Sequence, residues 1–159
     1  MSSADRTPRM AAILTTLLAL LLQLLPLPTV LAWLRPSFAV LTVLFWSIAA
    51  PRAGGFLLAF ATGLALDVFK GAVLGQHALA FAVVVYVAIR YHLQLRNKPL
   101  LEQALFVGLM MLVFESIIWA IDGWSGHPMN SAERWVPVAT GTAVFPLIVA
   151  LLDRYAVAR

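Results

Sequence analysis

The sequence predicts an all-α integral membrane protein, a bundle of six transmembrane helices. Of its 159 residues, 62% are hydrophobic and only 11% are charged, whereas a soluble domain has roughly a quarter charged residues. The hydrophobic residues gather in six runs that polar residues, Pro or Gly separate. These runs lack the alternation of barrel strands, and in lipid only helices and closed barrels satisfy their own backbone hydrogen bonds. A helical bundle is therefore expected.

The first run, 10–25, follows a short polar arm at 1–9. It resembles the hydrophobic part of a signal peptide, but it is longer than usual, and no small-residue cleavage site precedes Pro26 and Pro28. We therefore expect a retained first helix that ends near Val30.

The second run, 37–50, is short and lies between Pro36 and Pro51. A complete crossing needs about 20 residues. This helix therefore includes Trp33 and its neighbours, thins the bilayer locally, or does not cross completely. We expect a crossing.

Four further runs complete the predicted bundle, with a polar break at each junction. They cover residues 54–69, 72–91, 100–121 and 135–152. Together the runs define a transmembrane domain at 10–153, between an N-terminal arm at 1–9 and a C-terminal tail at 154–159.

The distribution of Lys and Arg predicts the orientation of these helices. With the N-terminus inside, eight basic residues fall in inner segments and three in outer ones, as the positive-inside rule requires. Without the second crossing, Arg90, Arg96 and Lys98 would lie outside. We therefore expect both termini in the cytoplasm.

Several classes of function are disfavoured by composition. The basic residues are scattered between apolar runs, so they form no cluster that could follow a nucleic acid backbone. Cysteine is absent, and His77, His92 and His127 lack the spacing of metal ligands. No nucleophile motif or phosphate-binding loop occurs. We therefore expect no enzyme, metal or cofactor.

Small residues repeat every fourth position along the third run and end in an acid: Gly55, Ala59, Gly63 and Asp67. In a membrane, such a stripe lets two helix backbones approach closely. It either packs this helix against its neighbours inside the bundle or forms a docking surface for another membrane protein.

Three acids lie in or beside the predicted helices. Asp67 is placed near the outer interface, within reach of water, where Lys70 could pair with it. Glu115 and Asp122 are two turns apart on nearly one face of the fifth helix. Acids in a membrane are candidates for function. These three either line a proton or cation path or are neutralised inside the bundle by Lys70, Arg134 or His77.

The five tryptophans all fall near predicted helix ends, as expected of an interfacial aromatic belt: Trp33, Trp46, Trp119, Trp124 and Trp135. Pro137 and Pro146 are expected to kink the last helix.

Several ordered motifs resemble those of the MreD family of rod shape-determining proteins. They are Arg35-Pro36, Pro51, the series Gly63, Asp67, Gly71 and Gly75 at intervals of four, Tyr91-His92-Leu93-Gln94, and Arg96-Asn97. The resemblance extends from the basic arm to Asp122.

The resemblance implies a non-enzymatic scaffold subunit of the elongasome in the bacterial inner membrane. It would bind the bitopic protein MreC and, with MreB, RodA and the penicillin-binding partner of RodA, organise lateral peptidoglycan synthesis and rod shape. The family fold is similar to that of the substrate-binding subunits of energy-coupling-factor transporters, and relatives carry an acid at the position of Glu115. The glycines of the series, including Gly71 and Gly75, become candidates for partner binding beside Asp67.

A vitamin-binding subunit of such a transporter is the main alternative. It would enclose a small molecule in a pocket of roughly 300 to 1,000 Å³. An intramembrane enzyme remains a third class, although no nucleophile or metal set supports it. Membrane lipid is an expected contact, a homo-oligomer is possible, and nucleic acid is not expected as a partner.

Overall fold

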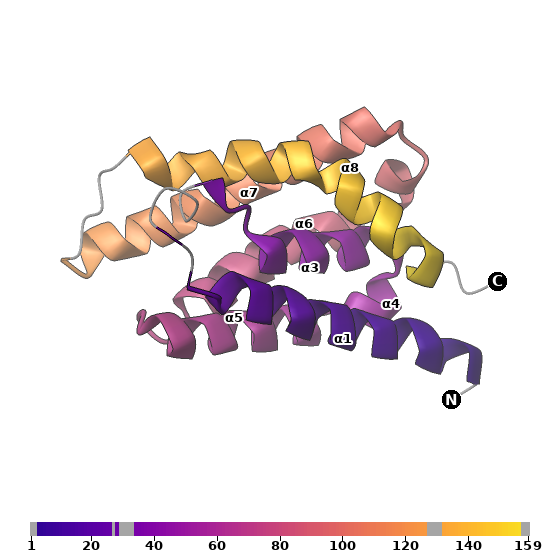
Figure 1. The fold of residues 1–159 in the computed structure, drawn as a ribbon, viewed down its shortest axis with the longest axis horizontal. Helices are drawn as coiled ribbons and strands as arrows, with labels where there is room; N and C mark the ends of the chain where they lie inside the picture. Colours follow the sequence, from indigo (N-terminus) through magenta and orange to yellow (C-terminus); the bar gives the residue numbers. More distant parts are fainter. Residues whose placement is uncertain (1–2, 27, 29–33, 127–131, 157–159) are drawn as a thin grey trace.

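A computed structural model describes residues 3–26, 28, 34–126 and 132–156, and within these ranges helices joined by short connections make up the chain, without a strand. Figure 1 shows helices packed side by side along one common direction. In chain order they are α1 (Ser3–Leu24), α3 (Phe38–Ala49), α4 (Pro51–Gly54), α5 (Phe56–Lys70), α6 (Gln76–Arg96), α7 (Leu100–Trp124), the 3-10 turn η1 (Ala132–Trp135) and α8 (Val136–Ala156).

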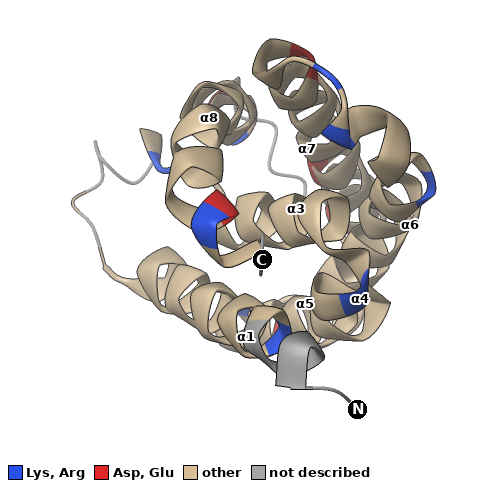
Figure 2. Cartoon of the chain, turned by 90° about the vertical axis from the view of Figure 1, so that its right-hand side faces the viewer, with Lys and Arg blue, Asp and Glu red and all other residues tan. Residues whose placement is uncertain are grey.

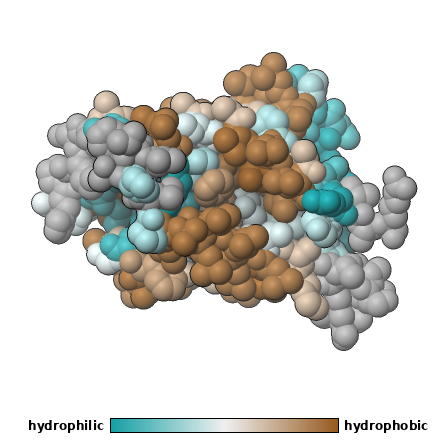
Figure 3. Space-filling model, in the orientation of Figure 1, coloured by the Kyte–Doolittle hydropathy of each residue, from teal (hydrophilic) through white to brown (hydrophobic). Residues whose placement is uncertain are grey.

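Three helical segments among the described residues are long and apolar enough to cross a membrane: Gln76–Arg96, Leu100–Trp124 and Ala132–Ala156. Two shorter apolar helices, Pro8–Leu24 and Phe38–Ala49, accompany them. On the face drawn in Figure 3, hydrophobic residues occupy the middle of the molecule and hydrophilic residues lie mainly toward its ends. This distribution suits a protein surrounded by lipid at mid-height.

The two ends of the bundle contain different parts of the chain. Figure 1 places both termini and α4 at one end, which we call the terminal end. The turn between α5 and α6 lies at the opposite end, which we call the distal end. The predicted polar arm is helical from Ser3 onward, so α1 begins about two turns earlier than residue 10. The predicted helix end near Val30 lies outside the described residues.

Helix α3 occupies the centre of the bundle. Every residue from Ala39 to Ile48 is buried, and α3 packs against α1, α6 and α8. Its 12 residues extend about 18 Å at 1.5 Å per residue, which is less than the hydrocarbon thickness of about 30 Å. Because protein surrounds this short helix, its length need not match that of the bilayer. Trp33, one candidate for extending the predicted crossing, lies outside the described residues.

The prediction that Trp46 belongs to an interfacial belt is wrong. Its side chain is fully buried in α3, and its Nε1 donates a hydrogen bond of 2.9 Å to Thr15 Oγ1 on α1. A buried indole needs such an acceptor, and the sequence does not show that α1 supplies it. In contrast, Trp124 at the end of α7 is 94% exposed.

A short helix, α4, follows α3 and was not predicted. Pro51 occupies its first position, where a missing N–H costs no helical hydrogen bond. A side chain at Gly54 would collide with Trp46, so this glycine lets α4 fold back closely on α3. The turn fixes the position of Arg52 at the terminal end.

Helices α5 and α6 form a close hairpin. A Cβ at Gly63 would collide with the backbone of Ala78 on α6. Gly71 and Gly75 adopt φ values of 63° and 96° in the connecting turn, a conformation that side chains disfavour. These glycines permit both the contact between the helices and the turn that joins them.

A charged site at the distal end

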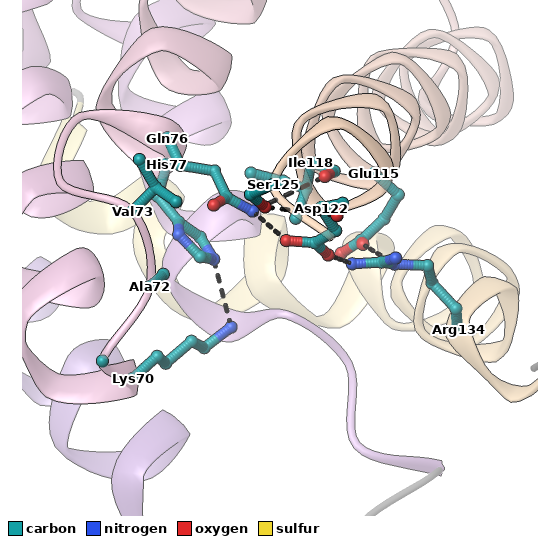
Figure 4. Close-up of a pocket in the computed structure, with 11 residues that line it drawn as sticks. Lys70, Ala72, Val73, Gln76, His77, Glu115, Ile118, Asp122, Ser125 and Arg134 are labelled. Carbon is teal, nitrogen blue, oxygen red and sulfur yellow. Dashed lines mark hydrogen bonds and ion pairs between the residues drawn. The ribbon is translucent and has the colours of Figure 1, made fainter. Parts of the chain in front are cut away.

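A cavity of about 380 Å³ opens at the distal end between the α5–α6 turn, α7 and the start of the last helical segment. Figure 4 shows polar side chains that converge on it from these elements. We define the distal site as six of its lining residues: Lys70, Gln76, His77, Glu115, Asp122 and Arg134. Of the predicted acids, Glu115 and Asp122 line this cavity directly.

The third acid, Asp67, lies behind the site and is only 1% exposed. Its Oδ2 accepts a hydrogen bond of 2.9 Å from the backbone N–H of Gly75, and its Oδ1 accepts one of 2.8 Å from that of His77. Oδ1 also lies 2.8 Å from His77 Nδ1. Asp67 therefore joins the end of α5 to the beginning of α6. The expectation that water reaches this acid was wrong, because the α5–α6 hairpin encloses it.

Lys70 forms a different contact from the predicted one. Its Nζ lies 3.4 Å from Nε2 of His77, not beside Asp67, whose two oxygens are already occupied. If His77 donates from Nδ1 to Asp67, its Nε2 is the acceptor for Lys70. The three side chains thus form a chain of hydrogen bonds from the cavity to the buried carboxylate.

Arg134 connects the last helical segment to both acids of α7. Its Nη2 donates a hydrogen bond to Asp122 Oδ2, and its Nε lies 3.7 Å from Glu115 Oε2. All three side chains are less than 20% exposed, so little water screens these ion pairs. The predicted neutralisation of Glu115 and Asp122 by Arg134 agrees with this geometry.

Gln76 was not singled out in the sequence, yet it connects α6 to α7. Its Nε2 donates a hydrogen bond of 2.6 Å to Asp122 Oδ1 and lies 3.5 Å from the carbonyl of Ile118. Nothing in the local sequence distinguishes this glutamine from others. Its separation of 46 positions from Asp122 makes the contact a property of the fold.

The stripe of small residues faces the interior of the bundle. Ala59, Gly63 and Asp67 are buried, and Gly63 lies against α6. Gly55 precedes α5, and a Cβ there would lie 3.0 Å from the carbonyl oxygen of Pro51. Of the two interpretations of the stripe, internal packing fits this arrangement, so a docking surface has to be sought on other faces.

The charged side chains of the distal site pair mainly with one another. Within the described part of the chain, no group of three or more His, Asp or Glu residues could hold a metal ion. The hydroxyl of Ser125 donates to a carbonyl of its own helix at 2.9 Å. Such an arrangement fixes α6, α7 and the last helical segment relative to one another, and it presents no activated nucleophile.

These features define the class of the protein: a helical membrane protein whose buried charges hold its helices together. The family described as rod shape-determining protein MreD matches residues 6–154. The chain therefore belongs to the MreD family of rod shape-determining proteins, a family of shape-determining structural proteins rather than enzymes.

A curated relative supports this assignment. The rod shape-determining protein MreD of Haemophilus influenzae is 32% identical over 105 residues, which cover 66% of this chain and 65% of that protein. The match thus spans just under two thirds of the relative's length. No solved structure shows a significant match.

Proposed function

We propose that this protein is an inner-membrane scaffold of the bacterial elongasome that binds MreC and helps to organise lateral peptidoglycan synthesis. The observation that carries the proposal is the family match over residues 6–154, which supports a role in cell shape. Links to MreB, RodA and the penicillin-binding partner of RodA are indirect in this proposal. The protein acts by binding, because its buried charges are used for its own architecture.

The proposed topology has six crossings, with α1, α3, α5, α6, α7 and α8 as the crossing helices. The number of helices and their common direction support it. We propose that both termini lie in the cytoplasm, because basic residues such as Arg52 and Arg96 concentrate at the terminal end. The distal site then faces the periplasm.

A groove between α7 and α8 is the proposed docking face for MreC. It has a volume of about 540 Å³. Its small lining residues include Ala104 on α7 and Ala139 and Ala143 on α8. All its lining residues are uncharged, and the one hydroxyl, on Thr142, already donates to the carbonyl of Val138 at 2.7 Å.

The occupant proposed for this groove is the single transmembrane helix of MreC. Lipid chains are as apolar as leucine, so helices associate in membranes where small residues allow close packing. Ala139 and Ala143 are four positions apart on one face of α8, and both are exposed. These two alanines repeat the small-residue pattern of the stripe on α5, but on an exposed face instead of inside the bundle.

Affinity capture of MreC from detergent-solubilised membranes tests the proposal. We expect wild type to recover MreC and Ala143→Leu to lose most of this recovery, because a leucine would fill the groove. Ala150→Leu is the matched control, since Ala150 is also exposed on α8 but does not line the groove. Thermal unfolding of all three proteins verifies that they are folded.

Three other outcomes of the capture experiment would contradict parts of the proposal. Failure of folded wild type to recover MreC would overturn the proposed function. Equal recovery with Ala143→Leu and Ala150→Leu would move the docking face elsewhere. A co-purified vitamin with an ATPase module would favour the transporter alternative. The distal cavity does not favour that alternative, because its charged side chains pair with one another, whereas ligand pockets are mostly apolar.

A further inference from the structure

A second cavity, of about 680 Å³, lies at the terminal end. Its charged or titratable lining residues are Arg9 on α1, Arg52 on α4, and His92 and Arg96 on α6. The other described lining residues are alanine and proline, so no carboxylate lines it among the side chains that the structure describes. Figure 2 looks at this end and shows basic segments on α1 and α4. We call it the basic cavity.

The geometry points to the basic cavity as a binding site for the phosphate of an anionic phospholipid head group, and we propose this as a function separate from MreC binding. Three arginines from three helices meet there, and guanidinium groups bind phosphate through paired hydrogen bonds. The volume is that of about 20 water molecules at roughly 30 Å³ each. A head group larger than a single phosphate therefore has space.

Two of the arginines have no partner in the part of the chain that the structure describes. Neither Arg52 nor Arg96 forms an ion pair or side-chain hydrogen bond with any described residue, whereas Lys98 and Arg134 are both paired with acids. His92 donates from Nδ1 to the carbonyl of Ile89 at 2.6 Å, which leaves its Nε2 for a ligand. Arg52, Arg96 and His92 Nε2 thus offer donors for an anion that no described residue occupies.

The local backbone holds these donors in place. His92 and Arg96 are four residues apart and share one face of α6. Arg52 belongs to α4, which packs on α3 through the contact between Gly54 and Trp46. A site whose side chains are carried by packed helices requires little reorganisation on binding.

A lipid suits the cavity better than free phosphate because an exposed apolar row begins beside it. Met10 follows Arg9, and Leu14, Leu18 and Leu21 continue along α1, each more than half exposed. A phosphate at the level of Arg9 would place an acyl chain along this row. The position suits a lipid of the membrane leaflet at the terminal end.

Another account is that the arginines offset the negative C-terminal ends of α3 and α6. This account predicts an effect on stability rather than on lipid binding. Arg90 provides the matched control: it is exposed on α6, carries the same charge and does not line the basic cavity.

The test measures lipid retained by the purified full chain in mild detergent, by native mass spectrometry. Phosphatidylglycerol and phosphatidylcholine with identical acyl chains are compared, with inorganic phosphate as a separate competitor. We expect wild type to prefer phosphatidylglycerol, Arg52→Gln and Arg96→Gln to weaken its retention by about fivefold each, and Arg90→Gln to retain it fully. Inorganic phosphate alone should compete poorly.

The same experiment can overturn the proposal. Equal weakening by Arg90→Gln would indicate general attraction between charges, and equal retention of both lipids would exclude an anionic site. Tight binding of inorganic phosphate without preference for a lipid would assign the site to free phosphate. A lower Tm of Arg52→Gln or Arg96→Gln with unchanged retention would assign these arginines to the helix ends.

Discussion

The two ends of this bundle differ in whether their charged side chains are buried and paired or exposed and unpaired. At the distal end, Asp67 is buried and Arg134 is nearly so, and each is bound by neighbouring groups. At the terminal end, Arg52 and Arg96 are exposed and unpaired among the described residues. The distal charges pair with one another, whereas these two terminal arginines are available to an outside ligand.

This difference separates charged residues that stabilise the fold from charged residues that can bind a ligand. Removing one partner of a buried, hydrogen-bonded charge leaves the other without compensation and destabilises strongly. Removing an exposed charge changes stability little. Substitutions at the two ends should therefore differ in Tm even when the chemical change is the same.

Asp67→Asn should have the largest effect. The carboxylate accepts bonds from the N–H groups of Gly75 and His77 and contacts the imidazole of His77, and an amide would turn one oxygen into a donor facing other donors. We expect a loss of about 3–5 kcal/mol, measured by unfolding in detergent. Glu102→Gln is the control, since its half-exposed ion pair with Lys98 should contribute less than about 1 kcal/mol. Equal losses would contradict the burial of Asp67.

Arg134→Gln should have the next largest effect. It removes the cation that connects Asp122 and Glu115 to the last helical segment. Hydrogen bonds to charged groups contribute about 1.5–3 kcal/mol, so a loss of that size is expected in the free energy of unfolding. A smaller loss in the background of Asp122→Asn would demonstrate that the two residues act together. Additive losses would show that they do not.

Gly63→Ala tests the packing of α5 on α6. The added methyl group would meet the backbone of Ala78, which cannot rotate away as a side chain can, and overpacking costs about 1–3 kcal/mol. Gly123→Ala is the opposite control, because nothing lies within 4 Å of a Cβ there and alanine favours a helix by about 1 kcal/mol. A gain in stability at both positions would contradict the close packing of the hairpin.

Most of the helices could be predicted from the sequence because apolar runs follow local composition. The runs at 72–91 and 100–121 correspond to α6 and α7 with shifts of a few residues. Helix α4 could not be predicted, because its four residues depend on contact with Trp46. Burial of Trp46 itself depends on Thr15, a residue 31 positions away.

The sites were predictable to different degrees. Intramembrane acids stand out in an apolar sequence, so Glu115 and Asp122 were identified, with Arg134 as one of three candidate partners. The side of α5 that carries the small residues could not be assigned, because a stripe has the same pattern whether the neighbouring helix belongs to this chain or to another. The basic cavity was missed because its arginines lie far apart in the sequence and meet only when α1, α4 and α6 pack.

Arg52→Gln and Arg96→Gln should have the smallest effect on folding. Both side chains are exposed and have no protein partner among the described residues, so each variant should stay within about 0.5 kcal/mol of wild type. Arg134→Gln makes the same chemical change in the ion pair with Asp122, in which each side chain is less than 20% exposed. This variant should therefore lower Tm clearly. Thermal unfolding of the three variants in one detergent without added lipid makes the comparison. If Arg52→Gln or Arg96→Gln unfolded as early as Arg134→Gln, the terminal charges would be structural too, and the contrast between the two ends would fail.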